Sequence, residues 1–223
     1  MKITCIADLH GHYPKLTGGD LLIVAGDLTV SDKEYQYRNF YEWLDDQDYD
    51  LKIVIAGNHD DYCYECYKNQ CVPFGMKNVQ YLCDSACEFE GLKIWGCPWT
   101  PRFIGINPKC TAFTYDSEIW FYDEKVMKIP HDIDILITHG PAYGILDGIP
   151  IEDGTLFHSG SSAFEGWLKY VSRPRLHIFG HIHEAYGIQE IFPTYNDKMM
   201  QSINCSYVNE KYKPVNKPVD IEI

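Results

Sequence analysis

Residues Lys52–Asp60 read KIVIAGNHD, and this stretch decides the fold. It begins with an apolar run of strand length, Lys52–Ala56, and ends in the polar tetrapeptide GNHD at positions 57–60. A short run of β-branched and aliphatic residues bounded by turn residues predicts a buried strand. In α/β sheets, ligands gather beyond the carboxyl ends of the strands, so this tetrapeptide stands where a functional site would form.

Four further apolar runs along the chain end in the same manner. They are Lys2–Ala7 before Asp8-Leu9-His10, Leu21–Ala25 before Gly26-Asp27, Ile133–Thr138 before His139-Gly140-Pro141, and Arg175–Phe179 before Gly180-His181-Ile182-His183. Each motif alone is explained as well by an ordinary turn, but chance does not account for five in this order. Side chains two positions apart leave a strand on one face, so the two histidines of the last motif are expected to point into one site, as are Asp8 and His10.

The remaining pattern indicates a single α/β domain over residues 1–223. Tyr37, Phe40 and Leu44 recur at the spacing of an amphipathic helix. Glu90-Gly91 separates two short strand-like pieces, as in a hairpin. Helices are expected over Lys33–Asp46 and Ala163–Tyr170, a hairpin from Cys87–Phe89 with Leu92–Trp95, and further strands near Gly187–Ile191 and Ser202–Cys205.

Residues Pro98–Trp120 are rich in proline, glycine and aromatic side chains, which predicts a long ordered loop. Such loops often bind ligands. Aromatic faces can stack on a base and an arginine can hold a phosphate, so the candidate substrate contacts in this loop are Trp99, Arg102, Phe103, Phe113 and Tyr115. The alternative is that these aromatic side chains only pack the loop.

Composition bounds the class of protein. The 223 residues include 19 Lys and Arg against 32 Asp and Glu, a net charge of −13, which argues against an extended nucleic-acid partner. No leader pattern and no apolar run of about 20 residues is present, so neither export nor a membrane span is expected. The odd count of nine cysteines favours reduced thiols in the cytoplasm. Cys63, Cys66 and Cys71 form only a weak zinc pattern, because a fourth ligand at the usual spacing is missing.

The five motifs together resemble the calcineurin-like metallophosphoesterases, whose pattern is D-x-H, G-D, G-N-H-D/E, a later H, and G-H-x-H. The resemblance implies a four-layer α-β-β-α sandwich of two mixed sheets. It also implies a phosphoesterase with two divalent metal ions (Mn, Fe, Zn or Ni) and a metal-bridging hydroxide as nucleophile. By motif position, the implied ligands are Asp8, His10, Asp27 and His183 for the first ion, and Asp27, Asn58, His139 and His181 for the second.

Further roles follow from the same resemblance. His59 corresponds to the general acid that protonates the leaving oxygen, and Asp60 is expected to orient His59 and raise its pKa. Asn58, His12 and Arg102 are candidate substrate contacts. For His12, a plain surface position is an equal alternative. Of the other histidines, His158 is a candidate for a substrate loop.

The nearest resemblance within the superfamily is to the small proteins related to class III cyclic-nucleotide phosphodiesterases. The Arg of the protein-phosphatase motif G-D-x-x-D-R-G is missing after Asp27, which counts against a protein phosphatase. Some members of this group carry Gly at the position of His181, but this chain keeps the histidine. We therefore expect a phosphodiesterase for cyclic nucleotides or other small phosphodiesters. The alternatives are a phosphomonoesterase or protein phosphatase, a metal-binding scaffold with little activity, and a DNA nuclease of the same superfamily. A homodimer would match the class III relatives.

Overall fold

The N-terminal strands build the first of two large sheets. The computed structural model describes residues 1–103, 109–193 and 199–223. In the first sheet four strands run parallel, and a C-terminal strand pairs antiparallel with the first of them at the edge. Their order is β15 (Val219–Glu222), β1 (Lys2–Ile6), β2 (Gly19–Ala25), β3 (Tyr49–Ile55) and β4 (Val79–Tyr81).

The second sheet is also mixed. Its four inner strands are parallel and both edge strands are antiparallel to their neighbours. The order is β13 (Gly187–Pro193), β14 (Met199–Asn204), β12 (Leu176–Phe179), β9 (Ile135–Thr138), β6 (Leu92–Cys97) and β5 (Ser85–Phe89). The predicted hairpin is confirmed, since Phe89 of β5 pairs with Leu92 of β6 around Glu90-Gly91, both at positive φ.

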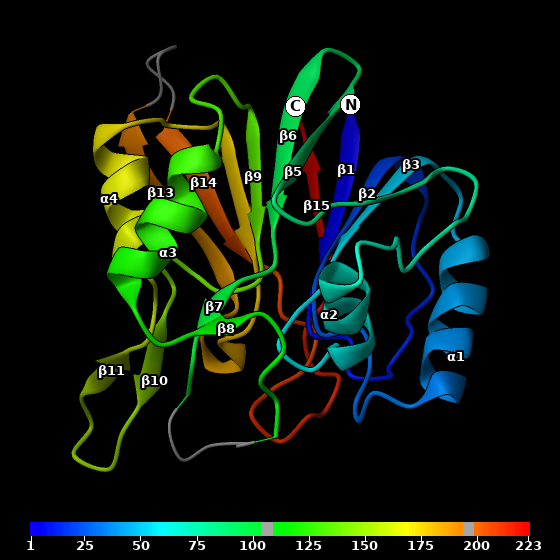
Figure 1. Cartoon of the computed structure of the whole chain (residues 1–223), viewed down its shortest axis with the longest axis horizontal. Helices are drawn as coiled ribbons and strands as arrows, with labels where there is room; N and C mark the ends of the chain where they lie inside the picture. The colour runs from blue at the N-terminus through cyan, green and yellow to red at the C-terminus, as the bar shows by residue number, and fades with distance from the viewer. Residues whose placement is uncertain (104–108, 194–198) are drawn as a thin grey trace.

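The two sheets pack face to face because their inner strands carry buried apolar side chains on both faces. In β1, Ile3 and Cys5 join the core between the sheets, whereas Ile6 joins the core under the helices. Ile135 and Ile137 of β9 meet this inner core from the second sheet. The helices cover the outer faces, α1 and α2 on the first sheet and α3 and α4 on the second (Figure 1). The expected four-layer α-β-β-α sandwich is confirmed.

The two predicted helices are present within one residue of their expected bounds. α1 (Glu34–Asp45) buries Tyr37, Phe40 and Leu44, the residues whose spacing predicted it. α4 (Ser162–Tyr170) begins after Ser161, whose side chain accepts a hydrogen bond from the Phe164 amide and so caps the helix. A further helix, α2 (Asp61–Lys68), follows the GNHD motif directly.

The expectation of a long loop over Pro98–Trp120 is only partly right; residues 104–108 lie outside the described part of the chain. Two short strands, β7 (Thr100–Pro101) and β8 (Thr114–Tyr115), pair in parallel, and α3 (Glu118–Glu124) begins after Ser117, whose side chain caps it. Trp99, Phe113 and Tyr115 are buried in the core, so the alternative of aromatic packing holds for these three. The remaining elements are η1 (Val126–Lys128), β10 (Gly148–Pro150), β11 (Leu156–His158) and η2 (His183–Ala185).

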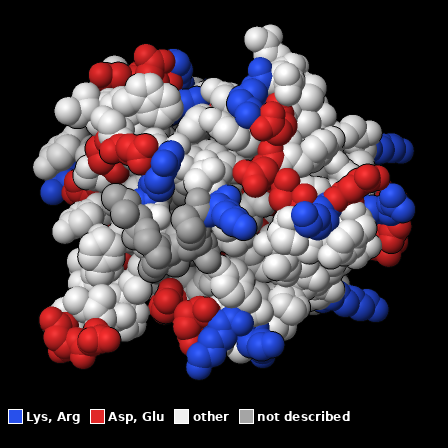
Figure 2. All heavy atoms as spheres, turned by 60° about the horizontal axis from the view of Figure 1, so that its bottom comes forward, with Lys and Arg blue, Asp and Glu red and all other residues white. Residues whose placement is uncertain are grey.

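The surface is mixed in charge. The end of the molecule at the bottom of Figure 1 carries acidic and basic side chains interspersed among uncharged ones (Figure 2). Among the described residues, none of the helices combines the length and apolarity that crossing a bilayer requires.

Candidate metal centre

The polar motifs converge at one end of the two sheets. β1, β2 and β3 of the first sheet, and β9 and β12 of the second, are each followed within three residues by a motif residue. Within the described part of the chain, the groups of side chains able to hold a metal ion draw only on six residues: Asp8, His10, Asp27, His59, His139 and His183. The five motifs, which are spread from Asp8 to His183, therefore form one site.

The first predicted ligand set is assembled around two facing imidazoles. His10 Nε2 lies 3.4 Å from His183 Nε2 and 3.5 Å from Asp27 Oδ2. Asp8 Oδ1 lies 3.8 Å from His183 Nε2. These nitrogen and oxygen atoms surround one point, as ligands of one cation do.

The second predicted set lies on the other side of Asp27. His139 Nε2 is 3.4 Å from Asp27 Oδ1 and 3.0 Å from Asn58 Oδ1. The His181 ring lies 4.9 Å from the His139 ring between centroids. Asp27 thus presents Oδ2 to the first set and Oδ1 to the second, which is the arrangement of a bridging carboxylate.

Backbone carbonyls fix two of the imidazoles. His139 Nδ1 donates to Ala25 O at 3.0 Å, and His183 Nδ1 donates to Asn209 O at 3.1 Å. An Nδ1–H bound in this way leaves the lone pair of Nε2 for a cation and holds the ring in orientation. The carbonyl of Asn209 comes from a C-terminal turn that no motif marked.

The charge states suit cation binding. Burial raises the pKa of Asp27, but His139, His59 and His10 together outweigh it and hold the pKa well below its usual range, so this carboxylate is ionised. Burial lowers the pKa of His10 to about 3 and that of His181 to about 3, so both rings are neutral at pH 7. Burial also lowers the pKa of His139, but Asp27 outweighs it and raises it to about 9. A cation would displace this proton, because only neutral imidazole binds metal.

Two atoms at the centre test the fit to a cation directly. Asp8 Oδ1 and His181 Nε2 are buried and have no hydrogen-bond partner among the described residues. Buried polar atoms are normally paired, and these two belong to the predicted ligand sets. Carboxylate, amide and imidazole donors suit Mn, Fe, Zn and Ni, so the residues present fit divalent metal ions.

The backbone at the centre is strained in a way that the motifs did not reveal. Asp8, His10, Asp27 and His181 have φ values of 53°, 41°, 54° and 71°. This left-handed region is uncommon for residues other than glycine and costs about 1–3 kcal/mol at each position. Four predicted ligands are therefore held in orientations that the surrounding structure imposes.

Two motif glycines are required by close approach. A Cβ at Gly57 would lie 2.2 Å from Asp27 Oδ1, and one at Gly180 would lie 2.3 Å from Asp8 Oδ2. Both distances are far below van der Waals contact, so no side chain fits. The glycines let neighbouring strand ends approach until the two carboxylates reach the centre.

His59 lies beside the centre, as predicted. Its Nε2 is 4.0 Å from Asp27 Oδ2, and its Nδ1 lies 3.3 Å from Val30 O and 3.5 Å from Cys110 Sγ. Burial lowers the pKa of His59, but Asp27 and the contact with Cys110 outweigh burial and raise it to about 10. The ring therefore carries a proton at pH 7 in this structure.

The predicted role of Asp60 needs correction. Its fully buried carboxylate accepts hydrogen bonds from the amides of Gly57 at 2.8 Å and Leu28 at 3.1 Å, rather than from the His59 ring. Burial and the nearby charge of Asp27 raise its pKa to about 7. The structure therefore gives Asp60 the role of tying together the loops after β2 and β3. The His59 ring is instead contacted by the carbonyl of Val30 and the thiol of Cys110.

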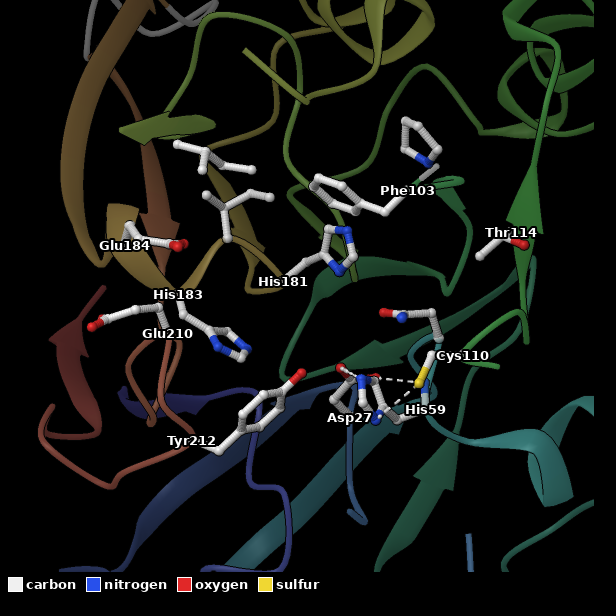
Figure 3. Close-up of a pocket in the computed structure, with 14 residues that line it drawn as sticks. Asp27, His59, Phe103, Cys110, Thr114, His181, His183, Glu184, Glu210 and Tyr212 are labelled. Atoms are coloured by element: carbon white, nitrogen blue, oxygen red, sulfur yellow. Dashed lines mark hydrogen bonds and ion pairs between the residues drawn. The ribbon is translucent and has the colours of Figure 1, made fainter. Parts of the chain in front are cut away.

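A cavity of about 150 Å³ opens over the centre. His181 lies under Phe103, while His59, Cys110 and Asp27 lie on one side and His183 and Tyr212 on the other (Figure 3). Cys110 and Tyr212 were missed, because both come from irregular segments without a recognisable motif. The Tyr212 ring packs 4.7 Å from the His10 ring and 5.4 Å from the His183 ring, between centroids.

Of the three candidate substrate contacts predicted from the sequence, His12 and Arg102 lie outside the lining of this cavity. His12 Nε2 contacts the carbonyl of Tyr212 at 3.1 Å. Arg102 pairs with Asp116 at 3.2 Å and faces a neighbouring cavity. Asn58, the third, lines the central cavity. Cys63 and Cys66 are buried on α2 and Cys71 is exposed; all nine cysteines are free.

Comparisons with known proteins agree with this geometry. Metallophosphoesterase domain-containing protein 1 of Homo sapiens is 33% identical over 248 residues, covering 100% of this chain and 71% of the relative. A UPF0046 protein of Caenorhabditis elegans is 30% identical over 258 residues, covering 100% and 60%. The crystal structure of TT1561 of Thermus thermophilus superposes with a TM-score of 0.61 at 15% identity, covering 91% of this chain and 88% of that one. The family model described as calcineurin-like phosphoesterase matches residues 1–185, and the chain belongs to this family of metal-dependent phosphoesterases.

Proposed function

We propose that this protein is a dinuclear metal-dependent phosphodiesterase acting on small phosphodiesters, cyclic nucleotides among them. The observation that carries the proposal is the position of Asp27. Its two carboxylate oxygens face different histidines, His10 at 3.5 Å and His139 at 3.4 Å, so one carboxylate can serve two cations. Such pairs of cations lie about 3.5–4 Å apart in enzymes that displace a phosphoryl group.

When bound, two divalent cations supply Lewis-acid polarisation of a phosphoryl oxygen and an activated water. The chain supplies the remaining functions. Asp27 lies between the two ligand sets and would contribute to both, and its Oδ1 also accepts a hydrogen bond from the His59 amide at 2.9 Å. His59, which lines the cavity, would donate a proton to the leaving oxygen. Val30 O and Cys110 Sγ hold its ring by Nδ1, which leaves Nε2 toward the cavity.

The charge of the cavity wall favours a diester over a monoester. Among the described residues, the lining contains neither Lys nor Arg, whereas Glu184 and Glu210 both contribute to it. A phosphomonoester carries close to two negative charges at pH 7, and a phosphodiester carries one. Two carboxylates at the wall repel the more highly charged substrate more strongly.

Hydrolysis of bis-p-nitrophenyl phosphate tests the activity. We expect EDTA to abolish the reaction and Mn²⁺ to restore it, because the proposed ligands hold the ions reversibly. If the metal-loaded protein cleaved no phosphoester, the proposal would fail.

A charge-neutralising variant tests the preference for diesters. Replacing Glu184→Gln and Glu210→Gln together should raise kcat/KM for p-nitrophenyl phosphate several-fold more than for bis-p-nitrophenyl phosphate. Glu34→Gln, on the distant helix α1, is the matched control and should leave kcat/KM unchanged for both esters. Equal effects on the two esters would contradict the electrostatic argument.

We further propose small phosphoesters, rather than nucleic acid or a membrane, as the partners, with a homodimer as the expected assembly. The net charge of −13 supports the first part. Nine free thiols support a reducing compartment such as the cytoplasm.

A further inference from the structure

A second, larger cavity adjoins the metal centre. Its volume is about 470 Å³, three times that of the central cavity, and within the range of ligand pockets, about 300–1,000 Å³. The two cavities share Pro101, Phe103 and Ile149 as lining residues. We call this second cavity the annex. Because the walls are shared, a molecule with its phosphate at the metal centre can extend into the annex.

The annex wall is largely apolar and aromatic. Phe157 lies in β11 and Ile151 directly follows β10, in the hairpin at the lower left of Figure 1. Both line the annex, and their exposed fractions are 54% and 46%. Phe103 lies on the shared wall, and its ring centroid is 5.2 Å from that of His181. Exposed apolar side chains that gather beside a polar centre are typical of a ligand site.

The charged residues of the annex are already paired. Glu118 accepts hydrogen bonds from the Tyr115 hydroxyl at 2.9 Å and from the Ala163 amide at 2.9 Å. Arg102 is paired with Asp116. The annex therefore offers little attraction to a further phosphate and favours an uncharged group.

One polar group of the annex is held in a defined orientation. His158 Nδ1 lies 2.7 Å from Asp147 Oδ1, and the Asp147 carboxylate is buried and also accepts hydrogen bonds from the amides of Gly144 and Gly160 at 3.0 Å each. This arrangement fixes the His158 ring and directs Nε2 away from Asp147. Nε2 can then form a hydrogen bond with a polar edge of a ligand.

We propose that the annex is the subsite for the organic group of the phosphoester, and that it takes a flat aromatic group such as an aryl ring or a nucleobase. The proposal rests on the phosphodiesterase function above. Phe157 and Phe103 supply the aromatic faces, and His158 supplies the hydrogen bond at the edge. An aromatic stack strengthens binding about two- to tenfold beyond the effect of area burial, and this is the scale of discrimination to expect.

Binding of non-hydrolysable phosphonates to the Mn²⁺-loaded protein tests the subsite without relying on turnover. By calorimetry, phenylphosphonate should bind about tenfold more tightly than methylphosphonate, and more tightly than cyclohexylphosphonate, which is similar in size but not flat. Phe157→Ala should remove most of this preference, and His158→Ala should leave it for phenylphosphonate but weaken binding of a phosphonate analogue of adenosine 5′-monophosphate several-fold. Tyr35→Ala, which removes a similarly exposed aromatic residue on α1, is the control.

The outcomes separate the two proposals. If the methyl and phenyl compounds bound equally tightly, or if Phe157→Ala weakened the binding of both equally, the proposal that the annex binds the organic group would be overturned. Tighter binding of cyclohexylphosphonate than of phenylphosphonate would overturn the aromatic specificity. A clear preference for phenylphosphonate in a protein that hydrolyses no phosphoester would sustain the annex and reject the phosphodiesterase function.

Discussion

Gly180 allows the sharpest test of the metal centre, because it perturbs a predicted ligand without removing it. In Gly180→Ala the new Cβ would lie 2.3 Å from Asp8 Oδ2 and 2.5 Å from the Cβ of Ala7. Ala7 is fully buried and its backbone forms an isolated β-bridge with Ser206, so it cannot retreat. The Asp8 carboxylate must therefore move.

The size of the effect follows from these distances. Restoring van der Waals contact from 2.3 Å requires a shift of about 1 Å, whereas metal–ligand distances tolerate about 0.2 Å. The Asp8 Oδ2 atom also accepts the His181 amide at 2.9 Å, so the same shift disturbs a second predicted ligand. Loss of such a supporting contact typically lowers metal affinity about 10–100-fold. Overpacking should also lower the free energy of unfolding by about 1–3 kcal/mol.

Mn²⁺ titration of the apo-protein, followed by hydrolysis of bis-p-nitrophenyl phosphate at saturating Mn²⁺, measures the effect. Gly166→Ala is the matched control: Gly166 lies in the middle of α4, and a Cβ added there would meet no atom within 4 Å. This control should gain about 0.5–1 kcal/mol of stability with unchanged metal affinity. Circular dichroism establishes that the variant is folded. A folded Gly180→Ala that binds Mn²⁺ within twofold of the original protein would refute the reasoning.

Three further changes test other parts of the structure. Asp27→Ala should remove both ions, as measured by elemental analysis, because one carboxylate serves both sets; retention of two ions per chain would contradict the bridge. His59→Ala should keep the metal but lower kcat most for esters with poor leaving groups, and an equal loss on activated and unactivated esters would exclude a general acid. Burial lowers the pKa of His177 from 6.5 to about 3. As the pH falls, this histidine is therefore protonated in the unfolded chain before it is protonated in the folded protein. Chemical denaturation should therefore show about 2 kcal/mol less stability at pH 5 than at pH 7 from this residue, and His177→Phe should remove that part of the pH dependence.

The strand ends were predictable from the sequence because two independent signals coincide there. Apolar runs such as Leu21–Ala25 mark buried parallel strands, and a polar residue such as Asp27 at the end of a run marks the edge where ligands meet. α1 was equally clear from the spacing of Tyr37, Phe40 and Leu44. The predicted site residues from these motifs do come together in space.

The rest depended on tertiary contacts that leave no periodic signal. α3 is a short helix in a segment rich in proline and aromatic residues, and its Glu118 is fixed by partners from distant α4 rather than by local propensity. Asp60 stands next to His59 in the sequence, but at the start of a helix its side chain turns back onto the amides of Gly57 and Leu28. Tyr212 reaches the centre from a C-terminal turn whose sequence resembles any surface loop.

The backbone at position 181 has a consequence for how this family can diverge. With φ at 71°, His181 occupies a conformation that glycine adopts without strain. Exchange of this histidine for glycine would therefore delete one side of the metal centre and relax the main chain in the same step. Most inactivating substitutions lower stability and are removed by selection for a folded protein, but this one is not opposed in that way. Position 181 is thus one of four predicted ligand positions, with Asp8, His10 and Asp27, where glycine could replace a metal ligand without strain in the main chain.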